Sequence, residues 1–426
     1  MRFEEALEEL ESRGPGRMVP DLDRIRALAE LLDHPELRYP TIHVTGTNGK
    51  TTTVRLMTRI LCAHGVSVGA YTSPHLASVR ERLALCDDPI SEEEFGETFE
   101  HLDPFLGEVD RRGELVTYFE ALTAMAYLWF ADKPVDAGVF EVGMGGEWDA
   151  TNLIRSEVAV FCSIHLDHPE LGSTVEEVAG EKAGIIKKES IVVIQDSGPA
   201  VLAIVEARAK ELGAPTLIQG REYRITNAVP AVGGQEIAVA TERGRYEDLF
   251  VPLFGRHQAE NTAMAVAASE AFLGRELSPD SLRQALAGAT SPGRLEVVSR
   301  HPLVVLDGAH NPHAARALSA ALPEAFTWRR LHLVLGVLST KDVAGILAPL
   351  APLADTTYAS ANSNAKSLSP EQMAAACRQA GMAASAYRSA GEALDAAEAA
   401  AEDDDLILVT GSLYTVADAR PRYAKD

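Results

Sequence analysis

The sequence predicts an α/β protein, with a P-loop-containing, doubly wound, mainly parallel sheet domain followed by a smaller Rossmann-like α/β domain. Three observations lead to this prediction. Short β-branched runs alternate with longer helical patterns along the chain, which is the order expected of a parallel sheet covered by helices. A glycine-rich loop joins one such run to a helix. The length of 426 residues is too great for one ordinary core and indicates two or three domains.

The elements of the first domain follow from apolar runs bounded by turn residues. Helical spacing predicts helices over 51–64 and 119–130. Residues 222–253 are rich in β-formers but broken by GG and RG, which indicates an antiparallel insertion or edge ribbon. The expected parallel strands are 41–44, 137–142, 158–164 and 190–194.

After Arg294 the alternation of strand and helix patterns restarts. The turn residues Ser-Pro-Gly-Arg at 291–294 therefore predict a hinge, with domains at 1–294 and 295–426. The Ala/Glu/Asp-rich stretch 392–405 has the spacing of an exposed helix that leads into the last strand. The strands expected in this domain are 303–306, 331–335, 356–360 and 406–409.

The net charge excludes several classes of partner. Lysine and arginine number 39 against 62 acidic residues, so the net charge is 39 − 62 = −23. Such a surface repels phosphate backbones and anionic lipids, which argues against nucleic-acid and membrane partners. The first residues carry acids and no apolar core of a signal peptide, and no apolar run reaches the length of a membrane span. We therefore expect a cytoplasmic protein, and a monomer.

The four cysteines are widely separated along the sequence. Cys62, Cys86, Cys162 and Cys377 fit neither a zinc-site spacing nor a disulfide framework. Cys162 stands in the apolar run VAVFCSI, and Cys377 stands in an alanine-rich helix pattern. The expectation is four reduced, buried thiols in a cytosolic protein.

The strongest local signal is TIHVTGTNGKTTT at 41–53, an apolar strand that runs into Asn48, Gly49, Lys50 and Thr51 at a helix start. Glycines let backbone N–H groups surround phosphate oxygens, and a lysine neutralises the terminal phosphates. The common Walker spacing needs glycine where Val44 stands, so this is a shorter G-x-x-G-K-T variant. Ligases, kinases and switch GTPases all use such loops, although the N-K-x-D motif of GTPases is absent.

Polar residues at the ends of two further strands suggest a magnesium site. Glu141 ends the run before GMGGEWDATN, and His165, Asp167 and His168 follow the next strand. Carboxyl ends of parallel strands meet at one sheet edge, where a carboxylate can hold magnesium. His168 is the better candidate ligand, whereas His165 is interpreted as structural, because a lone histidine is more often structural than a ligand. The next helix is expected to begin at 173 with a capping box to Glu176.

A series of motifs runs along the chain in a fixed order: HVTGTNGKTTT, TSPHL, ER at 81–82, TYFEALTAMA, EVGMGG-x-x-DATN, LDH with EKAGIIK, GRHQAENTAMA, SPGRLE, LDGAHNP and VTGSLYTV. In this order the motifs resemble those of the folylpolyglutamate synthase/dihydrofolate synthase family, within the Mur ligase superfamily. The resemblance covers nearly the whole chain, and the DATN and TSPHL motifs favour the folate branch over the cell-wall ligases.

The resemblance implies an ATP- and Mg²⁺-dependent ligase that joins L-glutamate to a pteroate or folate. Lys182 matches a lysine that such enzymes carbamylate, and His310 matches a residue of the cleft where nucleotide and glutamate meet; with Lys50 these are the implied catalytic residues. A loop at 18–21 is implied to cover the pterin. The implied ATP-binding residues are Asn48, Gly49, Lys50, Thr51, Asn261, Arg294 and Asp307; the metal ligands are Ser73, Glu141 and His168; and the pterin contacts are Thr117, Tyr118, Phe119, Glu120, Trp148, Asp149 and Ala150.

Two positions depart from the family pattern. Glu147 stands where arginine is usual, which reverses the charge and puts contacts to an anionic substrate there in doubt. Lys366 also replaces an arginine, which keeps the charge but loses the bidentate geometry.

Two alternatives stay open at this stage. One is another Mur-type ligase acting on a cell-wall precursor, which would be expected to have a nucleotide-sugar domain before its phosphate loop. The other is a non-catalytic P-loop regulator, which would bind nucleotide without glutamate-dependent turnover. The sequence also does not separate addition of the first glutamate to dihydropteroate from extension of folates.

Overall fold

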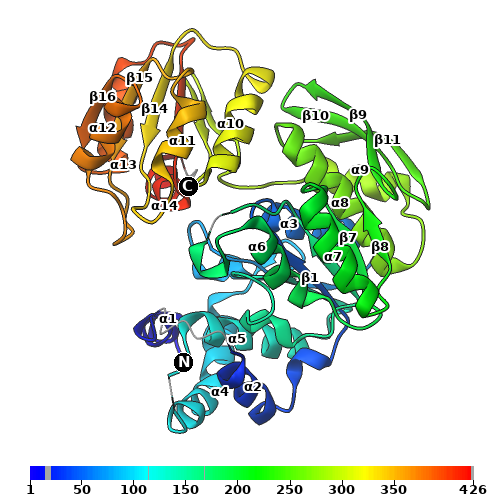
Figure 1. Ribbon diagram of the computed structural model, residues 1–426. Coiled ribbons are helices and arrows are strands. Elements are labelled where there is room, and N and C mark those ends of the chain that lie inside the picture. Colours follow the sequence, from blue (N-terminus) through cyan, green and yellow to red (C-terminus); the bar gives the residue numbers. More distant parts are fainter. Residues whose placement is uncertain (15–20, 114, 167, 424–426) are drawn as a thin grey trace. The chain divides into compact units, whose positions relative to one another are not determined.

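The computed structural model describes residues 1–14, 21–113, 115–166 and 168–423, which form two compact units. The first unit is made of Met1–Asn227, Ile237–Phe250 and Glu260–Ala289, and the second of Ala228–Glu236, Val251–Ala259 and the chain from Thr290 on. In Figure 1 the blue-to-green part carries an eight-stranded sheet, and the yellow-to-red part carries a six-stranded sheet. The predicted fold class is confirmed.

The eight-stranded sheet has the order β4-β3-β2-β5-β1-β6-β7-β8 and is parallel from β2 to β8. Its central strand β1 pairs with β5 on one side and β6 on the other, and all its residues are buried. The carboxyl ends of β1, β5 and β6 therefore share one edge, as expected. The strands are β1 Thr41–Thr45, β2 Val68–Tyr71, β3 Leu83–Leu85, β4 Asp88–Pro89, β5 Ala137–Glu141, β6 Val158–Phe161, β7 Ile191–Ile194 and β8 Thr216–Ile218.

Several helices in this part of the chain begin at a residue whose side chain caps the helix. Helix α5 is preceded by Thr117, whose side chain accepts a hydrogen bond from the backbone N–H of Glu120. The predicted capping box at 173 and 176 is wrong by one residue: Thr174 caps α6, and Glu177 completes the box. The helices are α1 Phe3–Ser12, α2 Asp23–Leu31, α3 Lys50–Ala63, α4 Glu92–Asp110, α5 Tyr118–Asp132, α6 Val175–Lys182, α7 Pro199–Glu211, α8 Arg256–Leu273 and α9 Pro279–Ala287.

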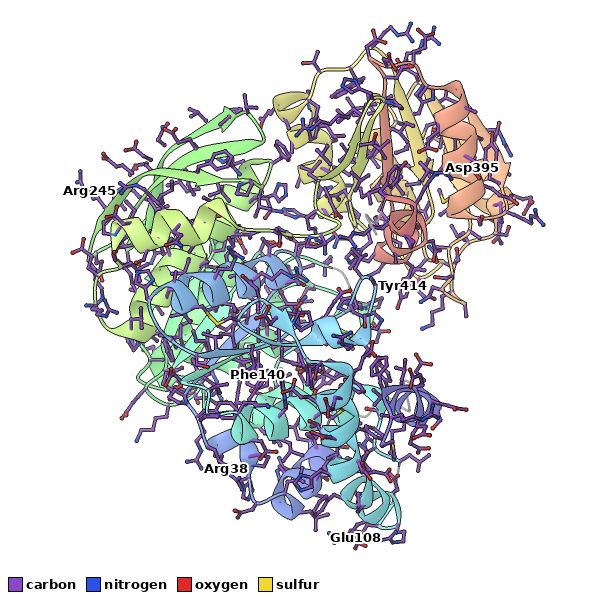
Figure 2. All side chains as sticks on the ribbon, turned by 180° about the vertical axis from the view of Figure 1, so that it is seen from behind. Arg38, Glu108, Phe140, Arg245, Asp395 and Tyr414 are labelled. Carbon is purple, nitrogen blue, oxygen red and sulfur yellow. A yellow bond between two sulfur atoms is a disulfide. The ribbon has the colours of Figure 1, made fainter. Side chains whose placement is uncertain are left out.

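Phe140 is at the centre of an aromatic cluster in the core of the first unit (Figure 2). The rings of Tyr39, Tyr71, Tyr127 and Phe130 lie 6.4, 6.0, 5.4 and 5.6 Å from its centroid. Offset and edge contacts of this kind add about 0.5–1.5 kcal/mol each beyond area burial. Because Phe140 immediately precedes Glu141 in β5, this cluster fixes the strand that carries the proposed metal ligand.

The six-stranded sheet has the order β12-β13-β17-β14-β15-β16 and is parallel except for β12. The predicted helix at 392–405 is α13, which ends at Ala400 and buries Ala393, Leu394 and Ala397, so it is not wholly exposed. The strands are β12 Glu296–Arg300, β13 Leu303–Leu306, β14 Leu331–Leu335, β15 Thr356–Ser360, β16 Ala384–Tyr387 and β17 Leu406–Thr410; the helices are α10 Pro312–Ala325, α11 Val343–Leu350, α12 Pro370–Gln379, α13 Ala390–Ala400 and α14 Leu413–Ala419.

The β-rich stretch predicted at 222–253 forms a separate three-stranded sheet of order β11-β10-β9. Its strands are β9 Arg224–Ala231, β10 Gly234–Ala240 and β11 Arg245–Val251. Among the described residues, no helix is both long and apolar enough to cross a membrane.

The cysteine prediction is half wrong, because Cys62 and Cys86 form a disulfide. The fold brings these two cysteines together although they are 24 residues apart in the sequence. Helix α3 ends beside Cys62, the chain returns along β2, and β3 runs back so that the Cys86 N–H donates to the Val68 carbonyl (2.8 Å). Cys162 and Cys377 are free and buried, as predicted.

Candidate functional site

The phosphate loop follows β1 and leads into α3. Gly49 is the N-cap of α3 with a φ of 88°, a conformation that favours glycine. A Cβ placed on Gly49 would lie 2.6 Å from Oδ1 of Asn261 in α8, so only glycine allows this approach. The loop is tied to the end of β6, where the Thr47 N–H donates to the Ser163 carbonyl (2.7 Å). The structure thus brings together Gly49 and Asn261, both predicted to bind ATP.

Two lysine amines converge on this loop. Nζ of Lys50 and Nζ of Lys182 both donate to the Gly46 carbonyl, at 3.1 and 3.0 Å. Lys182 is only 3% exposed. Both line a small cavity of about 20 Å³, which has room for one water molecule or a single ion. The convergence makes this a site of concentrated positive charge in an otherwise acidic protein.

Glu141 lies beside the start of α3, at the end of β5. Its carboxylate accepts hydrogen bonds from the Thr51 hydroxyl (3.0 Å) and the Ser73 N–H (3.2 Å), and it is 1% exposed. Three residues assigned to nucleotide and metal by resemblance are therefore in direct contact. A buried carboxylate next to hydroxyl groups offers the hard oxygen donors that Mg²⁺ prefers.

The histidines after β6 have different surroundings. The His165 backbone exchanges hydrogen bonds with the Thr47 hydroxyl, which ties it to the phosphate loop. The side chains of His165 and His168 line the same small cavity as Lys50. The third polar residue of this motif, Asp167, lies outside the described residues. In the described part of the chain, His, Cys, Asp and Glu side chains form no group of three suited to a metal; the predicted set has only two such residues, with Ser73 as the third.

The loop after β2 carries a pair that sequence reasoning missed. Nε–H of Arg82 donates to Nδ1 of His75 (2.9 Å), and the guanidinium lies over the Tyr118 ring, 5.4 Å from its centroid. Burial, with Arg82 as the second cause, lowers the pKa of His75 to about 4. His75 is therefore a neutral acceptor that orients Arg82 over a predicted pterin-contacting residue. Both residues stand in motifs that had been recognised, but nothing in the sequence indicated that they would pair.

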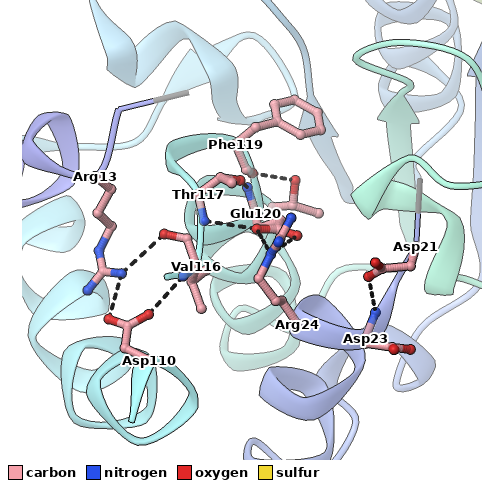
Figure 3. Close-up of polar contacts among 10 residues, drawn as sticks. Arg13, Asp21, Asp23, Arg24, Asp110, Val116, Thr117, Phe119 and Glu120 are labelled. Carbon is pink, nitrogen blue, oxygen red and sulfur yellow. Dashed lines mark hydrogen bonds and ion pairs between the residues drawn. The ribbon is translucent and has the colours of Figure 1, made fainter. Parts of the chain in front are cut away.

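The four predicted pterin contacts at the start of α5 do different things. Figure 3 shows the Glu120 carboxylate held by the Thr117 N–H (2.8 Å) and by Nε of Arg24 in α2 (3.0 Å). Arg24 and Glu120 have side chains only 12% and 9% exposed, so this ion pair is largely desolvated. Thr117 and Glu120 are thus engaged in holding the helix start. Phe119 instead presents its ring to Gly143, where a Cβ would be 2.5 Å away.

Of the other predicted contacts, Trp148 is partly buried against the core near α6, while Asp149 and Ala150 are buried. The Ala150 carbonyl accepts from the Tyr127 hydroxyl (2.9 Å). Glu147, the charge-reversed position, is exposed, and its N–H donates to the Glu181 carboxylate (3.0 Å). The loop predicted at 18–21 falls, apart from Asp21, outside the described residues.

The remaining predicted residues belong to the second unit. Asp307 accepts from the N–H groups of Leu295 (2.9 Å) and Ala309 (2.8 Å), and burial raises its pKa while Arg294 opposes that rise. Nδ1–H of His310 donates to the Gly308 carbonyl (2.8 Å), which fixes its tautomer with Nε2 as the acceptor in the neutral ring. Lys366 is exposed, and its carbonyl accepts from the Ser339 N–H (2.8 Å).

Comparisons with known proteins show the family to which the chain belongs. Residues 44–269 match the Mur ligase middle domain, and residues 293–413 match the Mur ligase glutamate ligase domain. The chain is 38% identical to the dihydrofolate synthase/folylpolyglutamate synthase of Mycobacterium tuberculosis, over 98% of this chain and 93% of that protein. It is 33% identical to the protein of the same name from Bacillus subtilis, over 95% of each.

Solved structures give the same picture. The Mycobacterium tuberculosis folylpolyglutamate synthase complexed with ADP has a TM-score of 0.94 and 37% identity, covering 100% of this chain and 98% of that one. The Escherichia coli FolC in complex with DHPP and ADP has a TM-score of 0.89 and 33% identity, covering 99% and 97%.

Proposed function

Because the chain belongs to the Mur ligase family and matches its dihydrofolate synthase/folylpolyglutamate synthase members along almost its whole length, we propose that it adds glutamate both to dihydropteroate and to reduced folates. It is an ATP-dependent ligase of the glutamate-adding kind. The double specificity is proposed because its relatives from Mycobacterium tuberculosis, Bacillus subtilis and Escherichia coli carry both names. The ATP-dependent chemistry is supported most directly by the contacts of Glu141 with Thr51 and Ser73 beside the phosphate loop.

The ATP phosphates are proposed to bind the loop of Asn48, Gly49, Lys50 and Thr51. Helix α3 begins at this place, and the N-terminus of a helix favours anionic groups, while Lys50 supplies a positive charge. Asn261, packed on Gly49, would complete the same side. Arg294 and Asp307 are proposed to bind the nucleotide as well, on the strength of the family resemblance.

Magnesium is proposed to bind Ser73, Glu141 and His168. The residue types fit the ion, since Glu141 is a buried carboxylate at the strand edge next to the phosphate loop. Ser73, whose N–H donates to that carboxylate, carries a hydroxyl that could serve as a second oxygen donor. When bound, the ion would neutralise phosphate charge. The Lys182 amine lies against the same loop, where a carbamate would carry an oxygen donor in its place.

The reaction needs an activated carboxylate. The γ-phosphoryl group passes from ATP to the substrate carboxylate, giving an acyl phosphate and ADP. The glutamate amine then attacks the acyl carbon, loses a proton and expels phosphate, leaving the amide. Lys50 would screen the repulsion between the two anions in the first step, and His310 is proposed to act near the glutamate. No side-chain nucleophile is required, so alignment supplies most of the rate.

The pterin is proposed to lie against Tyr118, Phe119, Trp148 and Ala150. Thr117, Glu120 and Asp149 act on this side too, through the hydrogen bonds that fix the helix start and the following turn. Arg82, held over Tyr118, is added to the set as a cation near the substrate's glutamate or benzoate end.

A phosphate-release assay tests the proposal. With ATP, Mg²⁺ and glutamate, the protein is expected to turn over with dihydropteroate and with a reduced folate, but not with a cell-wall precursor. Lys50→Ala should abolish release, whereas Lys188→Ala, which removes an exposed lysine, should not. Turnover with only one pterin substrate would remove the double specificity, and full activity of Lys50→Ala would remove the phosphate-loop assignment.

A further inference from the structure

One face of β1 is tied to the loop that follows β5. Residues two apart in a strand point to the same side, and His43 and Thr45 are both fully buried. The Thr45 hydroxyl donates to the Gly145 carbonyl (2.9 Å), and Nε2 of His43 lies 2.8 Å from the Thr151 hydroxyl. The two side chains therefore form hydrogen bonds with the 143–151 loop at two points.

The contact between His43 and Thr151 extends to a carboxylate, that of Asp149. The Thr151 hydroxyl lies 2.6 Å from Oδ1 of Asp149. An ionised carboxylate only accepts, so the Thr151 hydroxyl donates to Asp149 and must accept from His43. Nε2 of His43 then carries the hydrogen, and Nδ1 is a bare lone pair. Nδ1 has no hydrogen-bond partner among the described residues, and burial lowers the pKa of His43 well below its usual range. Both facts agree with a neutral ring that donates from Nε2.

Asp149 connects these hydrogen bonds to the turn that precedes it in the sequence. Its carboxylate also accepts from the Met144 N–H (2.9 Å) and the Thr151 N–H (3.0 Å), so it closes the loop from both ends. Asp149 is only 5% exposed, so its carboxylate is almost wholly surrounded by the protein. The position of Met144 and its neighbours is thus set by the chain His43–Thr151–Asp149.

That turn lies next to the proposed pterin side. The Phe119 ring packs directly on Gly143, leaving no room for a Cβ there. A shift of the turn by a few tenths of an ångström would therefore move the Phe119 ring or change the shape of the space beside it. We propose that His43 and Thr151 are positioning residues for the pterin substrate, acting through Asp149 on the turn that supports Phe119. This inference rests on the proposed pterin-binding role of Phe119.

Paired substitutions separate positioning from general stability. Thr151→Val removes the donor to Asp149 while keeping the side-chain shape, and Thr151→Ser restores it. Loss of a hydrogen bond to a charged group predicts a rise of roughly tenfold or more in KM for the pterin substrate. KM for ATP should stay within about twofold, because the phosphate loop is held separately by Ser163. Thr41→Val is the matched control. Thr41 is buried, lies on the same strand as His43, and its hydroxyl has no partner in the described chain.

A readout independent of activity keeps the test decisive. Amide hydrogen exchange across 142–150 should quicken in Thr151→Val and in His43→Leu, but not in Thr41→Val or in His43→Gln, which keeps an N–H donor. The exchange result stands even if the wild-type protein shows no pterin-dependent turnover, which would sink the proposed function alone. Unchanged exchange in Thr151→Val and His43→Leu, or an equal rise in both KM values, would overturn the positioning role. If Thr151→Val does not fold, the His43 pair decides by the same measures.

Discussion

Removing the disulfide between Cys62 and Cys86 should destabilise the first unit by a predictable amount. The bond closes a loop with a sequence separation of 24 residues. The chain-entropy relation for a loop of that size gives about 3.4 kcal/mol at 25 °C, the amount by which the bond restricts the unfolded chain. The double variant Cys62→Ser/Cys86→Ser should lose roughly this much free energy of unfolding, and neither residue lies among the predicted ligand contacts.

Urea unfolding can report on the first unit alone. Of the three tryptophans, Trp129 and Trp148 belong to the first unit and Trp328 to the second. In a Trp328→Phe background, tryptophan fluorescence therefore follows the first unit, which avoids treating a two-unit protein as one transition. Dithiothreitol should destabilise the protein with both cysteines and leave the double variant unaffected.

Thiol counting supplies an independent control. Of the four cysteines, two are paired, so 4 − 2 = 2 thiols should react in denaturant without reductant, and four after reduction. A loss below about 1 kcal/mol in the double variant, despite two unreactive cysteines in the parent, would refute the entropic reasoning. Four reactive thiols without reductant would refute the bond itself.

Three further predictions concern the site. Gly49→Ala should raise KM for ATP at least about tenfold, because a Cβ would collide with Asn261; Gly65→Ala has a similar φ of 82° with no atom within 4 Å and should leave that KM unchanged. Glu141→Gln should lower phosphate release by about 100-fold or more and raise the Mg²⁺ concentration needed in a titration, whereas Glu36→Gln, at another buried glutamate, should alter neither. His75 has a folded-state pKa of about 4, below its usual 6.5, so the folded protein excludes a proton that the unfolded chain binds. Its contribution to stability is complete above pH 6.5 and is lost as the pH falls towards 4, and urea unfolding of His75→Gln should show a shallower loss over that window; an unaltered slope would contradict the pKa.

The central strands of the two large sheets were predictable, because they are buried, mainly apolar runs bounded by turn residues. The predicted strands 303–306, 331–335 and 356–360 agree with β13, β14 and β15 at both ends. The run predicted at 158–164 was too long, since β6 ends at Phe161 and the polar loop of the site begins there. The proposed phosphate loop was visible because Gly49 allows the positive φ of the turn and a lysine follows it directly at the helix start.

What the sequence did not reveal depends on contacts between distant segments. Cys62 and Cys86 are paired by the return of β3 along β2, and spacing alone carries no sign of that. Arg24 is an ordinary helix arginine until the fold places it on Glu120, 96 residues away. The burial of the Lys182 amine likewise depends on the phosphate loop, which lies far from Lys182 in the sequence.

The Lys50 amine rests on the Gly46 carbonyl, an oxygen without net charge. An ammonium held by a carboxylate would have to surrender a full ion pair before it could turn towards an arriving polyanion. Breaking a hydrogen bond to a neutral amide oxygen costs little free energy, since charged phosphate oxygens attract the ammonium far more strongly than the carbonyl does. If Lys50 binds the phosphates as proposed, the Gly46 carbonyl holds the ammonium in place beforehand, and giving up this hydrogen bond would cost little nucleotide affinity.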